Sequence, residues 1–210
     1  MEFSEVIATR RAVNHFDPNR DVPDALLRQV VEMAATTPSS FNLQPWSLMV
    51  LRDKEEKLRL QKQAMGQVKV SEAPVTLIVL ADRKGWADEC HFTEKNFQEM
   101  IKAGTMKEGQ RDWFTKARTK LYGTTEESQL AFATKNTGFF AMTLMLSARS
   151  VGLHAHPMDG FSMEGVMKEF NIPDTYWVPL LMSVGYFNED KELAPAKWRK
   201  TYDEIVVRFD

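Results

Sequence analysis

The residues best suited to bind a ligand lie in a short polar stretch, Thr36–Trp46, which reads TTPSSFNLQPW. Four side chains there carry hydroxyl or amide groups and follow an apolar segment with helical spacing: Ser39, Ser40, Asn42 and Gln44. Such groups, together with free backbone N–H groups, can bind the hydroxyls or the phosphate of a polar ligand. The same composition also suits a polar turn that ends a helix, and this segment alone favours neither interpretation.

Two basic pairs lie at opposite ends of the chain, Arg10-Arg11 and Lys197-x-Arg199. Guanidinium and ammonium groups are the usual protein ligands of phosphate. Each pair also has a simpler explanation. Arg10 falls at the end of a short predicted helix, where the helix dipole favours a cation, and Lys197 and Arg199 could be solvated charges in a basic tail.

Five segments, in this order and spacing, resemble the nitroreductase-like family of FMN-dependent oxidoreductases. RRAVNHF (10–16) is similar to the family's R-R-S-x-R/K-x-F, and PSSFNLQPW (38–46) matches P-S-S-x-N-x-Q-P-W at every fixed position. QVKVSEAP (67–74) looks like the segment before the second core strand, PMDGF (157–161) resembles P-x-E/D-G-F, and Lys197-x-Arg199 matches a basic pair near the C-terminus. The resemblance covers nearly the whole chain and fades between residues 85 and 123.

This resemblance implies an α+β fold with a central, mostly antiparallel sheet flanked by helices. It further implies one domain over residues 1–210 with a helical excursion at about 85–123, and an intertwined homodimer with C-terminal strand exchange. The implied activity is ping-pong transfer of a hydride from NAD(P)H to FMN and then of electrons to a nitroaromatic, quinone or similar small-molecule acceptor. The flavin carries this chemistry, so no side-chain acid or base is expected.

The resemblance also assigns cofactor roles to individual residues. Arg10, Lys197 and Arg199 would bind the phosphate, the other subunit would supply Ser39, Ser40 and Asn42, and Gln67 with Lys69 would reach the pyrimidine edge. Lys69 would support the reduced flavin, and backbone N–H groups at Asp159 and Gly160 would face N5 and O4. The full expected set is Arg10, Arg11, Asn14, Pro38, Ser39, Ser40, Asn42, Gln67, Lys69, Pro157, Met158, Asp159, Gly160, Lys197 and Arg199.

Four aromatic residues are the expected acceptor contacts: Phe41, Trp113, Phe114 and Tyr122. Phe41 could equally be an aromatic that packs in a dimer. Three positions depart from the family pattern. Ala12 replaces a usual Ser, Asn14 replaces a usual Lys or Arg, and Gly66 replaces a common Asn. Together they predict an FMN that is held more loosely or differently.

The elements that would position these residues follow from periodicity and from capping signals. The first expected helix is Glu5–Arg10, capped by Ser4. The second starts at Asp21–Asp24 and has its apolar face at Leu26, Leu27, Val30, Val31 and Ala34. The others are a helix from Asp53 through Met65, helical segments between Trp86 and Tyr122, Glu126–Val151, and Ser162–Phe170. The expected strands are Trp46–Leu51, Pro74–Ala81, Leu153–His156 and Val178–Tyr186. The continuous apolar run PVTLIVLA predicts a strand covered on both faces.

Two further segments bear on assembly. The Glu126–Val151 helix carries a stripe of small and aliphatic residues, which suits either a dimer seam or the core of one chain. The apolar tail Ile205–Phe209 predicts a strand, and the resemblance suggests that it pairs with the partner subunit's sheet.

Composition excludes several other classes. A net charge of −2 over 210 residues gives no reason to expect nucleic acid. The single Cys90 leaves no disulfide framework or thiolate cluster. The N-terminal residues have no apolar signal segment and no run is long enough to span a membrane, so a cytoplasmic protein is expected. G-x-G-x-x-G, Walker A and G-x-S-x-G motifs are absent.

His154 and His156 lie two residues apart, on one face of a predicted strand. Two imidazoles make half of a metal site and no third ligand lies near them, so we expect packing, with His156 able to line a flavin pocket, and no metal. Two rivals to the enzyme hypothesis stay open. One is a flavin-binding carrier or sensor without turnover, and the other is a helical interaction module that uses the Glu126–Val151 stripe.

Overall fold

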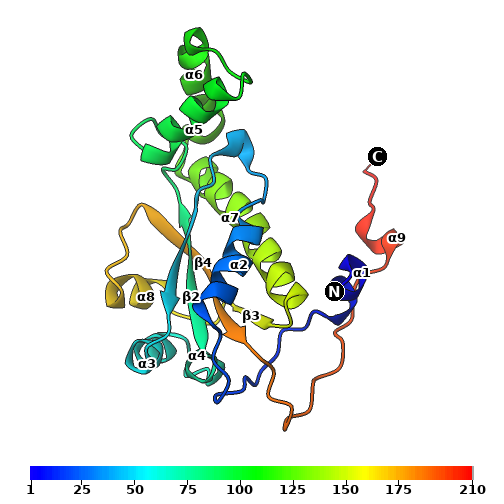
Figure 1. Cartoon of the computed structure of the whole chain (residues 1–210). Helices are drawn as coiled ribbons and strands as arrows, with labels where there is room; N and C mark the ends of the chain where they lie inside the picture. Colours follow the sequence, from blue (N-terminus) through cyan, green and yellow to red (C-terminus); the bar gives the residue numbers. More distant parts are fainter. Residues whose placement is uncertain (210) are drawn as a thin grey trace.

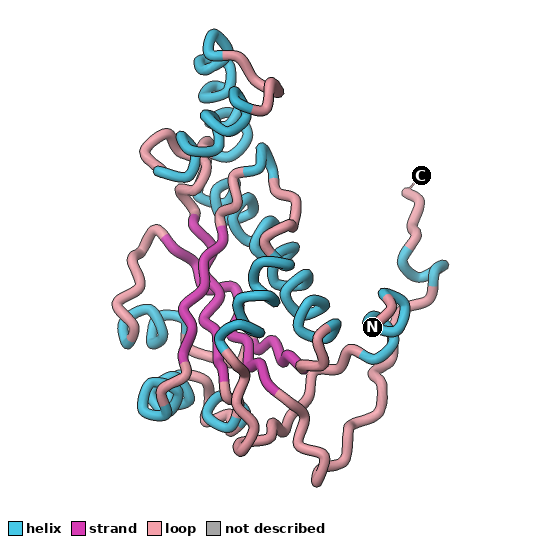
Figure 2. Tube along the Cα trace, in the orientation of Figure 1, coloured by secondary structure: helices cyan, strands magenta, loops and turns pink. Residues whose placement is uncertain are grey.

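The computed structural model describes residues 1–209 and has the predicted α+β architecture. Four antiparallel strands form one sheet in the order β1-β2-β4-β3 (Figure 1; Figure 2). Their bounds are Trp46–Leu51 (β1), Val75–Asp82 (β2), His154–Met158 (β3) and Tyr176–Gly185 (β4). All four lie within one or two residues of the predicted strands, and β2 and β4 are mostly apolar runs of strand length.

Both faces of the sheet are covered, as predicted for β2. Val75, Leu77 and Val79 of β2 pack in one core cluster with α2 (Asp24–Ala34) and α7 (Glu126–Ser150). The alternate residues Ile78 and Leu80 pack in a second cluster with the smaller helices on the opposite face. These are α3 (Lys54–Gln63), α4 (Lys69–Glu72) and α8 (Met163–Glu169). The period of two along a strand divides one apolar run between the two layers.

The long helix α7 settles one open alternative. Of its predicted small-residue stripe, Ala141 and Ala148 are buried against α2 and the sheet of the same chain, and Ala133 is buried in the cluster of Phe97 and Phe114. The intrachain interpretation of that stripe therefore holds, and the dimer-seam interpretation of it was wrong. The opposite face of α7 exposes Phe139 and Met142.

Side-chain caps mark the starts of several helices. The side chain of Asp53 accepts hydrogen bonds from the backbone N–H groups of Glu55 and Glu56, and Ser162 accepts from Gly165 N–H, as their positions in the sequence predicted. The first helix, α1 (Phe3–Thr9), begins before Ser4 and has Glu2 at its N-cap, so the predicted Ser4 cap was wrong.

Residues 85–123 form a helical projection at one end of the molecule (Figure 1). It consists of α5 (His91–Lys102), a 3₁₀ turn η2 (Glu108–Gln110) and α6 (Arg111–Tyr122). Phe97, Phe114 and Phe132 form an aromatic core between this projection and α7. A second 3₁₀ turn, η1 (Ser40–Asn42), precedes β1.

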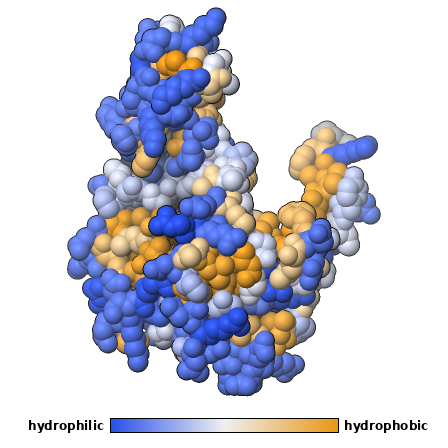
Figure 3. Space-filling view, in the orientation of Figure 1, coloured by the Kyte–Doolittle hydropathy of each residue, from blue (hydrophilic) through white to orange (hydrophobic). Residues whose placement is uncertain are grey.

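The C-terminal segment forms no strand within its own chain over Ile205–Phe209. The predicted pairing of this segment with the partner subunit's sheet stays a prediction. A short helix, α9 (Tyr202–Ile205), ends at Ile205 and the remaining described residues are irregular. A capping box fixes this helix, because Glu204 Oε2 accepts hydrogen bonds from the backbone N–H and the hydroxyl of Thr201. Residues 189–209 are all exposed and extend away from the body of the chain as an arm (Figure 1; Figure 3).

Among residues 1–209, no helix has the length and apolar character needed to cross a membrane.

Candidate functional site

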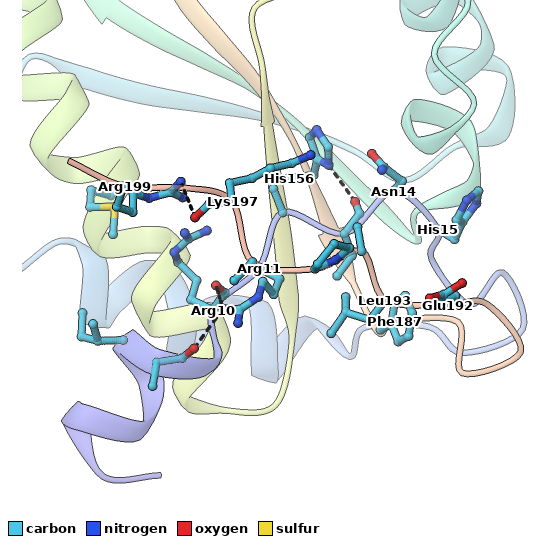
Figure 4. A pocket seen from close by; sticks show the side chains of 18 residues that line it. Arg10, Arg11, Asn14, His15, His156, Phe187, Glu192, Leu193, Lys197 and Arg199 are labelled. Carbon is cyan, nitrogen blue, oxygen red and sulfur yellow. Dashed lines mark hydrogen bonds between the residues drawn. The ribbon is translucent and has the colours of Figure 1, made fainter. Parts of the chain in front are cut away.

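One cavity joins the two end regions of the described chain. It measures about 770 Å³, and its wall includes the predicted phosphate ligands Arg10, Arg11, Asn14, Lys197 and Arg199 (Figure 4). The turn after α1 supplies the first three, and the exposed C-terminal arm supplies the last two. The basic pairs that lie almost 190 residues apart in sequence therefore enter one cavity.

Basic side chains outnumber acidic ones in this cavity, because Glu192 is the single carboxylate among the described residues that line it. None of its arginines or lysines forms an ion pair among the described residues. Burial lowers the pKa of Arg10, and the nearby charges of Arg199 and Arg11 lower it further. Like charges held together in this way favour an anionic ligand.

The simpler explanation for the first basic pair applies in part to Arg11. Its guanidinium NH1 donates to the carbonyl oxygens of Ala8, at 2.9 Å, and of Arg10, at 3.1 Å. These bonds satisfy carbonyl groups at the C-terminal end of α1, as expected for a helix-end cation. No side-chain hydrogen bond of this kind involves Arg10 in the described chain, and in Figure 4 its side chain points toward Arg199.

A second predicted group forms where α4 meets the loop after β3. Gln67 Nε2 donates to the carbonyl of Gly160 at 2.9 Å, and Lys69 Nζ donates to Gln67 Oε1 at 3.1 Å. Burial lowers the pKa of Lys69. A Cβ at position 160 would lie 3.3 Å from Gln67 Nε2, so glycine leaves this approach open. The residue before Gln67, Gly66, has φ +70° and so adopts the left-handed backbone that ends α3.

The rest of the PMDG segment contributes less. Met158 is buried in the core between β3 and α8, so its side chain cannot reach a ligand in the cavity. Pro157 is half-buried in β3, and Asp159 is exposed. Only the backbone of this segment remains available for the predicted contacts.

His156 connects the two predicted groups. Its ring lines the basic cavity and its Nδ1 lies 2.7 Å from the carbonyl oxygen of Val13. Lys69 is close enough to help lower its pKa. Neighbouring His154 bonds Arg149 instead, with 3.4 Å between Nε2 and NH1. Within residues 1–209 no group of three His, Cys, Asp or Glu side chains lies close enough together to hold a metal ion.

The Ser39–Asn42 loop does not reach the basic cavity of its own chain. None of its residues lines that cavity. Instead, Asn136 of α7 accepts from the backbone N–H of Ser40 at 3.0 Å, and Lys135 Nζ donates to Ser40 Oγ at 3.0 Å. Ser39 Oγ accepts from the backbone N–H of Gln44, and Pro38 is exposed at the start of the loop.

The conformation of this loop is unusual. Phe41, at φ 51°, and Asn42, at φ 55°, both adopt the left-handed region, which is costly for a residue with a Cβ. Asn96 of α5 holds both of them: its Nδ2 donates to the Phe41 carbonyl and its Oδ1 accepts from Asn42 Nδ2, each at 2.9 Å. The helical projection and the loop are therefore tied together.

The four predicted acceptor aromatics lie together beside this loop. The ring of Phe41 is 6.2 Å from Trp113, 5.8 Å from Phe114 and 6.2 Å from Tyr122, measured between centroids. Trp113 is exposed, whereas Phe41 and Tyr122 are half-buried. Phe114 is only 1% exposed and packs on Phe97, so its predicted direct contact with an acceptor was wrong; it supports Phe41 from within the core.

Comparison with known proteins shows which family the chain belongs to. The sequence profile of the nitroreductase family matches residues 7–186. The chain belongs to the nitroreductase family. A relative named NADH dehydrogenase, from Thermus thermophilus, is 32% identical over 183 residues, which cover 86% of this chain and 84% of the relative. MhqN of Bacillus subtilis, assigned as an NAD(P)H nitroreductase, is 27% identical over 206 residues and covers 98% of both chains.

A solved structure supports the same conclusion. A protein from Exiguobacterium sibiricum, assigned as a nitroreductase and crystallised in complex with FMN, matches with a TM-score of 0.85 at 25% identity. The match covers 98% of this chain and 96% of the other.

Sequence reasoning missed several residues of this nitroreductase-family site. Phe187 and Leu193 line the cavity, and Asn96, Lys135 and Asn136 hold the Ser39–Asn42 loop. One signal was available for Asn136, because an amide at a position of the buried apolar stripe of a helix must find a partner. Residues after Phe187 carry no such pattern.

Proposed function

We propose that this protein is an FMN-dependent oxidoreductase that takes electrons from NAD(P)H and reduces nitroaromatics, quinones or similar electron-poor acceptors. The observation that carries the proposal is the basic cavity, in which Arg10, Lys197 and Arg199 meet a single described carboxylate, Glu192, and form no ion pair with any described residue. FMN fits this donor set because its phosphate is a dianion and the rest of the molecule is uncharged. We place all of residues 1–210 in one domain of this kind.

The chain's own residues have distinct parts in this proposal. Bound FMN would accept a hydride from NAD(P)H and, after the oxidised nicotinamide has left, pass the electrons to the acceptor. Arg10, Lys197 and Arg199 bind the phosphate, assisted by Arg11 and Asn14. Lys69, which Gln67 holds in place, brings positive charge to the pyrimidine edge and stabilises extra electron density there.

The backbone of residues 157–160 would face N5 of the bound flavin. Gly160 has no Cβ, so its N–H can approach a flat ring closely. Its carbonyl accepts from Gln67, which fixes the orientation of this peptide. These groups position and polarise the flavin, and no side-chain acid or base takes part in the hydride transfer.

The proposed site needs two copies of the chain. Ser39, Ser40 and Asn42 are absent from the cavity that contains Arg10, so we place them at the partner's cofactor in a homodimer. Two exposed apolar surfaces support this assembly. The outer face of α7 exposes Phe139 and Met142, and the C-terminal arm exposes seven large apolar or aromatic side chains: Leu193, Trp198, Tyr202, Ile205, Val206, Val207 and Phe209. Surfaces of this kind are typical of subunit interfaces.

The acceptor then enters between the flavin and the aromatic group that contains Phe41, Trp113 and Tyr122. Phe41 stands edge-on to Tyr122 and Phe114, which restrains its ring. A flat, electron-poor acceptor can stack on such a surface. We place the protein in the cytoplasm, where NAD(P)H is available and where a chain with a single cysteine needs no oxidising environment.

The test is a spectroscopic titration of the purified protein. We expect FMN to bind with a stoichiometry of one per chain, and anaerobic NADPH or NADH to bleach the flavin absorbance. Subsequent addition of a quinone or a nitroaromatic should restore it. A protein that binds FMN but is not bleached by either nucleotide would be a flavin carrier or sensor. A protein that does not bind FMN would overturn the proposal.

A further inference from the structure

The hydrogen bond of His156 fixes the proton on its ring. His156 lies in β3, and its Nδ1 is 2.7 Å from the Val13 carbonyl oxygen. A carbonyl can only accept, so Nδ1 carries the hydrogen and donates it. In the neutral ring Nε2 is then a bare acceptor. Nε2 makes no hydrogen bond with any described residue.

The ring is neutral near pH 7. Burial lowers the pKa of His156 and the charge of Lys69 lowers it further, against the opposing effect of the bond to Val13. Its surroundings in the cavity are strongly cationic, and Figure 4 shows the side chains of Arg10, Lys197 and Arg199 entering the same cavity. These cations can only donate hydrogen bonds, whereas Nε2 can only accept one.

A ligand in this cavity therefore meets two different environments. The cations attract phosphate oxygens, which are acceptors. The lone pair of His156 Nε2 repels the same oxygens and favours a hydroxyl or an N–H group. Because β3 is part of the sheet, this acceptor is held rigidly, whereas Lys197 and Arg199 lie on the exposed arm.

We propose that His156 is a flavin-binding residue whose Nε2 accepts a hydrogen bond from a hydroxyl or N–H group in the uncharged part of FMN. It thereby gives the uncharged part of FMN a partner that does not attract phosphate oxygens, while the cations of the same cavity bind the phosphate. This inference rests on the proposed FMN site and adds a ligand contact that neither basic pair can provide.

Two amide substitutions separate the two nitrogens of the ring. His156→Asn can keep a donor to Val13 but has no group at the place of Nε2, and His156→Gln can place an acceptor there. Flavin affinity is measured on the apoprotein by quenching of flavin fluorescence, without turnover, using both FMN and riboflavin. Riboflavin lacks the phosphate, so it reports only on the uncharged part.

We expect His156→Asn to lower the affinities for FMN and for riboflavin by the same factor, about three- to tenfold, which corresponds to the loss of one neutral hydrogen bond. His156→Gln should retain most of the affinity. His91→Asn is the matched control, because His91 is exposed at the start of α5 and does not line the cavity. It should bind both flavins as the unmodified protein does. Circular dichroism and the melting temperature identify any variant that fails to fold.

Two outcomes would overturn the assignment while leaving the proposed function intact. In one, His156→Asn binds both flavins with unchanged affinity, which would make the ring a structural tie to Val13 and nothing more. In the other, only the affinity for FMN falls and that for riboflavin does not change, which would place His156 at the phosphate. If the unmodified protein binds neither flavin, the proposed function and this assignment fail together.

Discussion

The double variant Lys197→Ala/Arg199→Ala tests the phosphate site most directly. Both side chains line the basic cavity from an exposed segment. Solvent exposure places each charge-assisted contact at the lower end of its range, about 1–1.5 kcal/mol. Losing both should cost about 2–3 kcal/mol of binding free energy, which raises the Kd for FMN roughly 30- to 150-fold.

The same variant should leave the apoprotein's stability almost unchanged. Neither residue forms an ion pair with a described residue, and Arg199 donates only to the nearby carbonyls of Lys197 and Trp198. Removing Arg199 also relieves the repulsion that lowers the pKa of Arg10. We therefore expect the free energy of unfolding to change by less than about 0.5 kcal/mol.

Isothermal titration calorimetry with FMN and with riboflavin provides the assay. Riboflavin affinity should not change, because riboflavin has no phosphate. The double variant Lys191→Ala/Lys200→Ala removes two exposed cations of the same arm that do not line the cavity, and so controls for net charge. An unchanged FMN affinity, or an equal loss in the control, would refute the assignment of the phosphate to this cavity.

Three further variants test single features. Gly160→Ala places a Cβ 3.3 Å from Gln67 Nε2. It should lower the affinity for FMN severalfold in the same titration and leave the melting temperature nearly unchanged. An unaltered Kd would contradict the close approach. Asn96→Ala removes the bonds to the left-handed loop, so urea denaturation should show a loss of about 1–3 kcal/mol, and this loss should shrink in a Phe41→Gly background, where glycine relieves the strain. His154 has a pKa lowered to about 4 by burial and by Arg149, so the unfolded chain binds a proton first as the pH falls below about 6.5. Stability should therefore decline from pH 6.5 to 4, by about 1–2 kcal/mol after allowance for solvent screening; equal melting-temperature profiles for His154→Leu and the unmodified protein would disprove this.

Local patterns were sufficient for most of the fold. The run PVTLIVLA has only one stable place, between two layers, and β2 lies there. Asp53 and Ser162 marked helix starts because a short polar side chain can accept the free N–H groups of a first turn. The tail is a different case, because a strand needs a neighbouring strand to pair with. Ile205–Phe209 pairs with no strand of its own chain, and the Thr201–Glu204 capping box starts a short helix that ends at Ile205.

The site depended much more on long-range contacts. No periodicity could bring Arg10 to Arg199, and only the family pattern suggested it. Phe114 was misplaced because an aromatic residue in a polar helix can face either way, and here Phe97 and Phe41 enclose it. Asn96 lies in a helix whose sequence gives no sign of the strained loop that it holds, because that loop lies more than fifty residues away.

The long helix α7 sets the geometry of the proposed dimer. The Ser39–Asn42 loop is attached at Asn136, and Arg149, which bonds Thr9 of α1, marks the end near the basic cavity. Thirteen residues of α-helix separate these points by about 20 Å. A two-fold axis makes the interface self-complementary, so each copy must present both ends to the other. The midpoint of this interval is Met142, which is exposed and lines the cavity. An axis near Met142 would bring the loop of one copy to the cavity of the other, and so complete two equivalent flavin sites that neither chain could form alone.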